Sequence, residues 1–333
     1  MVQWIKSLAR HLPLLRDILA ERDHLRGKNA ELARSKEALR TRLATCEAEY
    51  KALQRKHGFV PPGHFYSPIP DFRKARATAE SVFKRVSRTV PGLNMREAQQ
   101  RALLERLVAF YDDMNFPEQK QPGIRYHYEN PAYSYSDAIL LHCLMRELAP
   151  VRIIEIGSGY SSCMMLDTNE AFFEDRIETT FIEPFPELLV SLLEDTDLGR
   201  IRLLDQPLQD VPLDLFEELQ SGDILFIDST HVSRIGSDVN RIIFEILPCL
   251  NPGVYVHFHD IFFPFEYPVS WVEEGRAWNE AYLLRAFLTF NPSFQIVLMN
   301  TFMHRFHREF FEQHMPLTLR NTGGSIWLRR TED

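Results

Sequence analysis

VRIIEIGSGYSS, residues 151–162, is an apolar run that ends in a loop of small residues. Residues 151–157 fit a buried strand, and the small residues after it let the backbone approach a ligand at the start of the next helix. The third glycine of a dinucleotide-binding G-x-G-x-x-G would fall at Ser162, so that pattern is incomplete. The stretch predicts a strand, a ligand-binding turn and a helix, with a plain tight turn as the alternative.

Strand and helix patterns alternate after this stretch. Further strands are expected at 178–184, 200–204, 223–229, 253–260, 294–300 and 323–330, and helices at about 136–148, 160–172, 186–193, 213–219, 237–249 and 277–289. Continuous apolar strands separated by helices are typical of a sheet that is covered on both faces. The predicted fold is therefore α/β, a Rossmann-like sheet of seven strands.

Ligands of such sheets bind outside the carboxyl ends of the strands. The second strand ends at Glu183, where a carboxylate can accept hydrogen bonds from ribose hydroxyls. The fourth strand ends at Asp228 with His231 close behind, and the fifth ends at His259 and Asp260. A carboxylate–imidazole cluster of this kind can hold a divalent metal or remove a proton from a hydroxyl. His257 is expected to point away from this cluster and to pack under a helix.

The strand order and the motifs EIGSGYSS, FIEP and DILFIDSTH resemble the class I S-adenosylmethionine-dependent methyltransferases over roughly residues 136–330. The resemblance is strongest to a bacterial group of sugar O-methyltransferases and cephalosporin-hydroxylase-like proteins. It implies S-adenosylmethionine as cofactor and transfer of a methyl group to a sugar, glycan or natural-product intermediate. The residues that it implies at the cofactor are Glu155, Gly157, Ser158, Gly159, Tyr160, Ser161, Glu183, Gln209 (at the adenine) and Asp228.

The resemblance also implies catalytic roles for His231, His259 and Asp260, with His231 as the general base. Metal-dependent relatives bind Mg²⁺ through acidic residues, and Asp228 and Asp260 match two of these positions. His259 stands where they have a carboxylate, and Mg²⁺ prefers oxygen ligands. Two alternatives remain open. In one, Asp228, His259 and Asp260 hold a divalent metal, either Mg²⁺ or a softer ion such as Mn²⁺ or Zn²⁺. In the other, no metal binds and the histidines act as acid and base.

The segment 261–280, IFFPFEYPVSWVEEGRAWNE, combines aromatic rings with carboxylates after the fifth strand. Such a loop suits stacking on a sugar ring, although it can equally be a lid on the core or a dimer contact. Two other functions compete with methyl transfer. One is a metal-dependent hydroxylase-like redox enzyme on the same fold, whose iron site would use two histidines and a carboxylate. The other is a coiled-coil scaffold without catalysis.

The N-terminal region has a different pattern. Ile18, Leu25, Leu32, Leu39, Cys46 and Leu53 recur every seven residues. This heptad repeat predicts a coiled coil over residues 14–57 that joins the chain into a homodimer or higher oligomer, and Asn29 at an a position favours a parallel pair. A single helix folded back on the catalytic body is the alternative. The predicted organisation is a coiled-coil helix at 1–57, a linker and helical cap at 58–135, and the methyltransferase domain at 136–333.

Charge is distributed unevenly along the chain. Residues 1–90 carry a formal charge of +10 and residues 91–333 a charge of −18. An acidic body is unsuited to binding a phosphate backbone, so no nucleic-acid partner is expected. The four cysteines are far apart, which argues for a reducing compartment. We expect a cytoplasmic protein, with peripheral membrane contact through the basic N-terminal arm as a further option.

Overall fold

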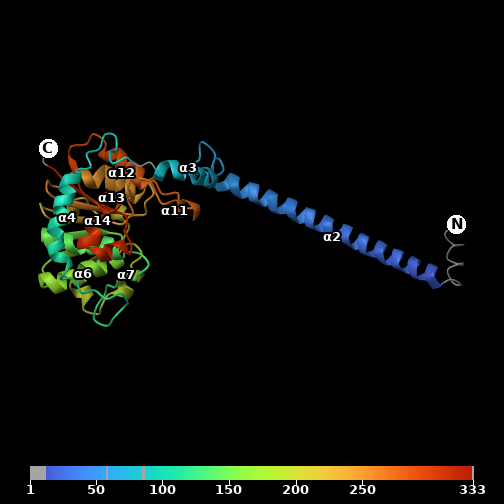
Figure 1. Cartoon of the computed structure of the whole chain (residues 1–333), viewed down its shortest axis with the longest axis horizontal. Coiled ribbons are helices and arrows are strands. Elements are labelled where there is room, and N and C mark those ends of the chain that lie inside the picture. The colour runs from blue at the N-terminus through green and yellow to red at the C-terminus, as the bar shows by residue number, and fades with distance from the viewer. Residues whose placement is uncertain (1–12, 58, 85–86, 332–333) are drawn as a thin grey trace. The chain divides into compact units, whose positions relative to one another are not determined.

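The computed structural model describes residues 13–57, 59–84 and 87–331, and the chain divides into two units, residues 1–71 and 72–333. The first unit contains one long helix, α2 (Pro13–His57), which Figure 1 shows as unbroken. The first part of the basic N-terminal arm considered for membrane contact, residues 1–12, lies outside the described residues. Within the described part of the chain, no helix is both long and apolar enough to cross a membrane.

The second unit is built around a seven-stranded sheet. Its strands are β1 (Arg152–Ile156), β2 (Glu178–Ile182), β3 (Arg202–Leu204), β4 (Ile224–Ile227), β5 (Tyr255–His259), β6 (Phe294–Met299) and β7 (Ser325–Arg330). They lie in the order β3-β2-β1-β4-β5-β7-β6. The first five strands are parallel, and β7 is antiparallel to both β5 and β6. This confirms the predicted α/β sheet of seven strands.

The central strands are buried on both faces. Every residue of β4 is buried, and so are all but the first residues of β1 and β5. Successive side chains of a strand point to opposite faces, so layers of structure must cover both sides. The longest helices of this unit are α3 (Phe72–Lys84), α4 (Glu97–Tyr111), α5 (Tyr135–Leu148), α6 (Tyr160–Phe173) and α12 (Glu280–Leu288).

Shorter helices complete the unit (Figure 1). They are α7 (Glu187–Leu192), α8 (Asp214–Glu217), α9 (Asp238–Arg241), α10 (Leu247–Cys249), α11 (Val269–Glu273), α13 (Asn300–Phe306) and α14 (Arg308–His314), with a π-helical turn at Ile242–Ile246 and 3₁₀ turns at Asp197–Gly199, Leu208–Asp210 and Pro316–Leu319. Sequence periodicity did not predict α11, α13 or α14. Each has seven residues or fewer, which is too short for a helical period to show.

The start of α5 differs slightly from the expectation. The helix begins at Tyr135, one residue before the expected start at about residue 136. Ser136 is buried and its hydroxyl lies 2.8 Å from Nε2 of His304. The neighbouring Asp137 accepts hydrogen bonds from the Ser325 hydroxyl and the Asn300 amide. Tertiary contacts therefore hold this end of the helix against β7 and α13.

Candidate active site

The loop between β1 and α6 is fixed by a close backbone approach. Gly157 has φ +79°, and its N–H donates to the carbonyl of Ile182 at the end of β2. A Cβ atom at Gly157 would lie 1.9 Å from the backbone oxygen of Asp228, which no side chain can tolerate. Only glycine fits here, because the loop passes directly against the end of β4.

Glu183 organises the loop from the neighbouring strand. One of its carboxylate oxygens accepts from the N–H of Ser158 (3.1 Å) and the other from the N–H of Phe185 (2.8 Å). A pocket of about 280 Å³ opens beside it and is lined in part by Gly157, Glu183, Gln209 and Asp228. The side-chain amide of Gln209 also donates to the carbonyl of Gly236, on the far wall of this pocket. Four residues predicted at the cofactor thus line one cavity at the carboxyl edge of the sheet.

The other predicted cofactor residues have different surroundings. Gly159 caps α6, and its N–H donates to the hydroxyl of Ser162. Glu155 is fully buried and accepts hydrogen bonds from the hydroxyls of Ser161 (2.5 Å) and Ser162. The ring of Tyr160 packs edge-on against His127. None of these residues is among those that line the described pocket, and neither is Ser158. The hydrogen bonds of Glu155, Gly159 and Ser161 shape the loop instead.

The predicted metal ligands come together at the ends of β4 and β5. One potential ligand atom from each of Asp228, His259 and Asp260 lies within 4.8 Å of the others. Nε2 of His259 is 3.4 Å from a carboxylate oxygen of Asp260. Two carboxylates and one imidazole form a donor set that suits a divalent cation of borderline softness. The redox alternative needs a second histidine ligand, which His231 would supply beside His259 and one of the carboxylates. His231 is not among the described residues whose potential ligand atoms meet in this cluster.

His231 lies between these carboxylates and a third one. Its Nε2 is 3.3 Å from Asp228 and 3.7 Å from Asp260, while its Nδ1 is 2.8 Å from Oε2 of Glu280. Glu280 is the first residue of α12 and is almost completely buried. Its other carboxylate oxygen accepts a hydrogen bond from the Ser229 hydroxyl. The sequence reading did not identify Glu280, although a carboxylate behind a candidate base is the arrangement that fixes its orientation.

The backbone also positions this histidine. His231 has φ +59°, a left-handed conformation that is uncommon for a residue with a side chain. Its carbonyl accepts hydrogen bonds from the N–H groups of Asn279 and Glu280 at the start of α12. The ring of Trp278 lies 4.3 Å from the imidazole, centroid to centroid. The start of α12 and the loop before it therefore hold both the base and its carboxylate partner.

The carboxylates that surround His231 and His259 shift the pKa values of both imidazoles. Burial alone would lower the pKa of His231, but hydrogen bonds to Asp228 and Glu280 outweigh it and raise that pKa to about 10. Burial likewise opposes the charged form of His259, and the carboxylates of Asp260 and Asp228 nevertheless raise its pKa. With these carboxylates alone around it, the imidazole of His231 thus carries a proton at neutral pH.

The prediction for His257 was wrong about its direction. Residues two apart in a strand face the same side, so His257 lies on the same face as His259, with their ring centroids 6.1 Å apart. His257 is fully buried and stacks on Phe226 at 3.9 Å, with Trp327 beyond it. Burial keeps the pKa of His257 well below its ordinary value, so it is a neutral part of the core beneath the site.

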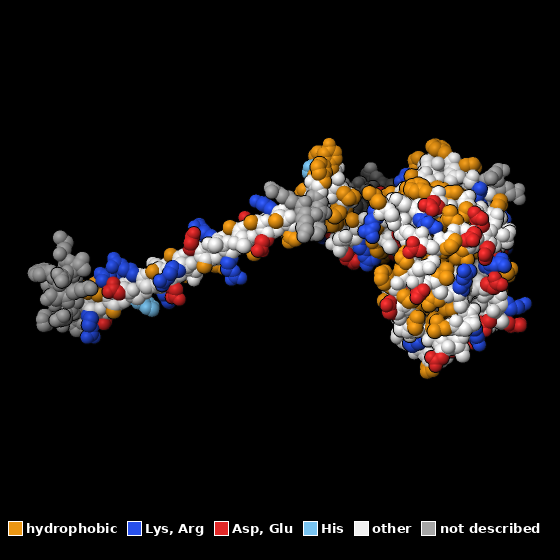
Figure 2. All heavy atoms as spheres, turned by 180° about the vertical axis from the view of Figure 1, so that it is seen from behind, with side chains coloured by type: hydrophobic (Ala, Val, Ile, Leu, Met, Phe, Trp, Pro, Cys, Tyr) orange, Lys and Arg blue, Asp and Glu red, His pale blue; other side chains and the backbone are white. Residues whose placement is uncertain are grey.

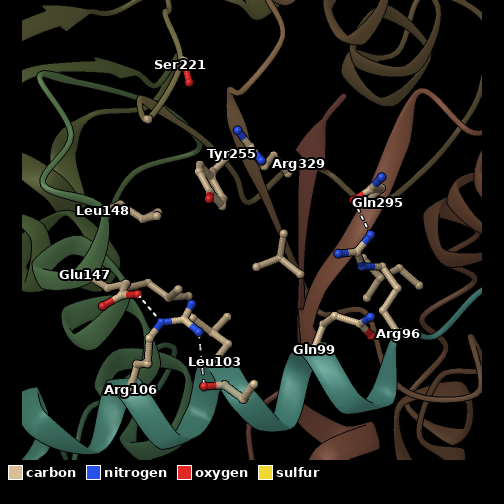
Figure 3. Close-up of a pocket in the computed structure, with 15 residues that line it drawn as sticks. Arg96, Gln99, Leu103, Arg106, Glu147, Leu148, Ser221, Tyr255, Gln295 and Arg329 are labelled. Atoms are coloured by element: carbon tan, nitrogen blue, oxygen red, sulfur yellow. Dashed lines mark hydrogen bonds and ion pairs between the residues drawn. The ribbon is translucent and has the colours of Figure 1, made fainter. Parts of the chain in front are cut away.

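A larger pocket lies elsewhere. It has a volume of about 580 Å³ and is lined by Arg96, Arg106, Arg329, Tyr255 and Gln295, among others (Figure 3). Tyr255 and Gln295 stand at the beginnings of β5 and β6, so this pocket is at the amino edge of the sheet. Arg106 is paired with Glu147 at 2.6 Å. None of the predicted site residues lines it, so pocket size does not indicate where the chemistry is.

Comparison with known proteins gives a family for the central part of the chain. Residues 154–261 match the model of a methyltransferase domain. A protein of Archaeoglobus fulgidus of uncharacterised function is 36% identical over 180 residues, which are 52% of this chain and 80% of that protein. The chain therefore belongs to a methyltransferase family. Its sheet has the strand order expected of the class I S-adenosylmethionine-dependent methyltransferases.

Solved structures provide more distant likenesses. A Podospora anserina methyltransferase with bound S-adenosylhomocysteine is 15% identical, with a TM-score of 0.39 over 83% of this chain and 100% of that one. The O-methyltransferase TomG of Streptomyces achromogenes, in complex with S-adenosylmethionine, is 15% identical, with a TM-score of 0.37 over 78% of this chain and 96% of that one. Likenesses at this level carry no argument about substrate.

Proposed function

We propose that this protein transfers a methyl group to a hydroxyl of a sugar, glycan or natural-product intermediate, with His231 as the general base. The observation that carries the proposal is the position of His231. Its Nδ1 is held by Glu280 at 2.8 Å, and its Nε2 faces the Asp228, His259 and Asp260 cluster. This cluster lies beside the pocket of about 280 Å³ at Gly157, here called the glycine-loop pocket. Because Glu280 holds the imidazole through Nδ1, Nε2 is the nitrogen that would exchange a proton with a bound substrate.

The pocket fits S-adenosylmethionine by the chemistry of its lining. Gly157 leaves the loop backbone open, Glu183 offers carboxylate oxygens for ribose hydroxyls, and Gln209 offers an amide for the adenine. Bound there, this cofactor would supply a sulfonium methyl group that is already activated for transfer. The chain must then provide alignment of the acceptor and removal of its proton.

Removal of that proton is the difficult part, because a sugar hydroxyl is a very weak acid. Asp228, His259 and Asp260 would hold a divalent cation, which would supply Lewis-acid chemistry that lowers the pKa of a nearby hydroxyl. A positive charge bound beside Asp228 would also lower the pKa of His231 from the value of about 10 that its carboxylate neighbours impose. His231 Nε2 could then accept the hydroxyl proton as the oxygen–methyl bond forms.

The half-buried rings of Trp271 and Trp278 would form the wall for the acceptor. They lie 5.4 Å apart, and Trp278 packs over His231. Half-buried aromatic rings beside a base suit a sugar ring or a flat natural product. The loop at 261–280, which we proposed for acceptor binding from its composition, supplies both rings.

The test is methyl transfer to a set of sugars and hydroxylated natural products, with the product identified by mass spectrometry. We expect a methyl ether, and we expect His231→Ala to lower turnover about 10²–10⁴-fold. His314→Ala, at an exposed position on α14, is the matched control. Near-normal turnover of a folded His231→Ala protein would show that His231 is not the general base. Methylation of amines but not hydroxyls would move the reaction to another atom.

A further inference from the structure

The helix α2 presents an apolar seam that nothing in the described first unit covers. Its heptad d positions are Ile18, Leu25, Leu32, Leu39, Cys46 and Leu53. The side chains of Leu32 and Leu39 are 65% and 63% exposed, and Ile18, Leu25 and Leu53 are also exposed. Figure 2 shows hydrophobic side chains along the length of this helix among charged ones. A seven-residue apolar repeat on a helix of 45 residues is stabilised when another helix packs along it.

We infer that the occupant of this seam is α2 of a second copy of the chain, in a parallel, in-register, two-stranded coiled coil. The first argument is the shape of the surface. A shallow groove on α2 is lined by Leu32, Ser35, Lys36, Leu39, Arg40 and Leu43. In the heptad these are d, g, a, d, e and a positions. In knobs-into-holes packing, each side chain of one helix enters a hole formed by four residues of the other. The groove contains two overlapping holes of this kind, the first formed by its first four residues and the second by its last four.

The second argument is charge complementarity at the flanks of the seam. In a parallel pair each g residue faces the e residue five positions later on the partner helix. Glu21 then faces the partner's Arg26, and Arg42 faces the partner's Glu47. Both contacts join opposite charges, and the symmetry of the dimer repeats each of them.

The polar a positions set the register. Asn29 meets the partner's Asn29 only when the helices are parallel and in register, where the two amides can hydrogen-bond to each other. Arg22 and Lys36 reduce the stability of the N-terminal half, although their long stems can carry the charges out to solvent. Leu43 and Tyr50 make the a positions of the C-terminal half apolar, so the pairing is strongest around Cys46.

The orientation has a consequence for the enzyme. The methyltransferase unit follows α2 in the chain, so a parallel pair attaches two catalytic units to the same end of the coiled coil. An antiparallel pair would attach them at opposite ends, separated by a helix of about 68 Å at about 1.5 Å per residue. The parallel arrangement therefore makes the enzyme a dimer whose two catalytic units follow the same end of the coiled coil in the chain.

Cys46 provides the orientation test, because it is the exposed cysteine; Cys143 and Cys163 are buried and Cys249 is half-buried. In a parallel, in-register pair the two Cys46 residues meet at one d layer, within reach of a disulfide. Treatment of the full-length protein with the diazene oxidant diamide should give a covalent dimer that dithiothreitol reverses. In this step two thiols give up two protons and two electrons to the diazene. Cys46→Ser should abolish the product.

Light scattering during gel filtration measures the assembly itself. We expect twice the chain mass of 39.0 kDa, and the mass of a single chain for Leu32→Glu/Leu39→Glu. The matched control Thr41→Glu/Ala48→Glu adds the same charge at two f positions with the same spacing, away from the seam, and should remain dimeric. Thermal unfolding of the second unit should be unchanged in both variants. A monomeric wild-type protein, a larger assembly, or a dimer that Cys46 does not cross-link would overturn the inference.

Discussion

His231 Nδ1 lies 2.8 Å from Oε2 of Glu280, although the two residues are 49 positions apart in the chain. The contact joins the end of β4 to the first turn of α12 and holds the imidazole so that Nε2 faces Asp228 and Asp260. In the proposed mechanism Glu280 is thus a positioning residue, which acts on the reaction through the histidine. Its burial leaves the carboxylate few partners other than His231 and Ser229.

Replacement of this carboxylate should reduce turnover more than acceptor binding. Glu280→Gln keeps the size of the side chain but removes the charge that stabilises the imidazolium formed during proton transfer. We expect kcat to fall about 10–100-fold, within the range of general-base effects, with a much smaller change in KM for the acceptor. Steady-state kinetics measures both. The exposed Glu309→Gln on α14 serves as control, and equal kcat values for the two variants would count against the positioning role.

The cluster of Asp228, His259 and Asp260 should bind a divalent cation in the protein without cofactor. Chelator-treated protein titrated with Mn²⁺ in a calorimeter should show one site, and Asp260→Asn should weaken it at least about tenfold because a charged ligand is lost. Glu266→Gln changes a carboxylate that is paired with Tyr282 and should leave the affinity unchanged. Wild-type protein that takes up no Mn²⁺ would favour a metal-free site in which the histidines act alone.

Glu155 should make the protein less stable as pH rises. Burial, opposed by hydrogen bonds from Ser161 and Ser162, raises the pKa of Glu155 to about 8, whereas the unfolded chain releases this proton near pH 4.5. The folded state holds the extra proton between these values, so the free energy of unfolding falls by up to about 1.4 kcal/mol per pH unit across that window. Glu155→Gln should flatten the decline in urea unfolding series at pH 5 to 8. Parallel slopes for the two proteins would contradict the assignment.

A buried ion-pair network should contribute strongly to stability. Arg125 has a side-chain exposure of 4% and pairs with Asp167 (2.7 Å) and Asp197 (2.6 Å). Arg125→Met would leave both carboxylates buried without their partner, which costs about 3–5 kcal/mol in such networks. Urea unfolding measures this loss. The exposed Arg176→Met provides the comparison, and a loss below about 1 kcal/mol at Arg125 would show that the network contributes little.

The sheet and most of the site were predictable because their signals are local. Most of the parallel strands are largely apolar runs, and polar residues at or soon after their ends must lie at the carboxyl edge. Glu183, Asp228, His231 and Asp260 were selected as candidates on this ground. Glu280 has no such signal, because a segment of 20 residues separates it from β5. Its role depends on where α12 begins in space. The prediction for His257 was wrong because it placed His257 and His259 on opposite faces of β5, whereas residues two apart in a strand point to the same face.

The glycine-loop pocket is the centre of the account, and a binding measurement tests it most directly. Isothermal titration of the purified full-length protein with S-adenosylhomocysteine, with and without a chelator, reports on the pocket without any acceptor. We predict binding at one site per chain in both conditions, and its loss in Gly157→Val, whose side chain would collide with the backbone of Asp228. Absence of binding by the folded wild-type protein in both conditions would contradict the account.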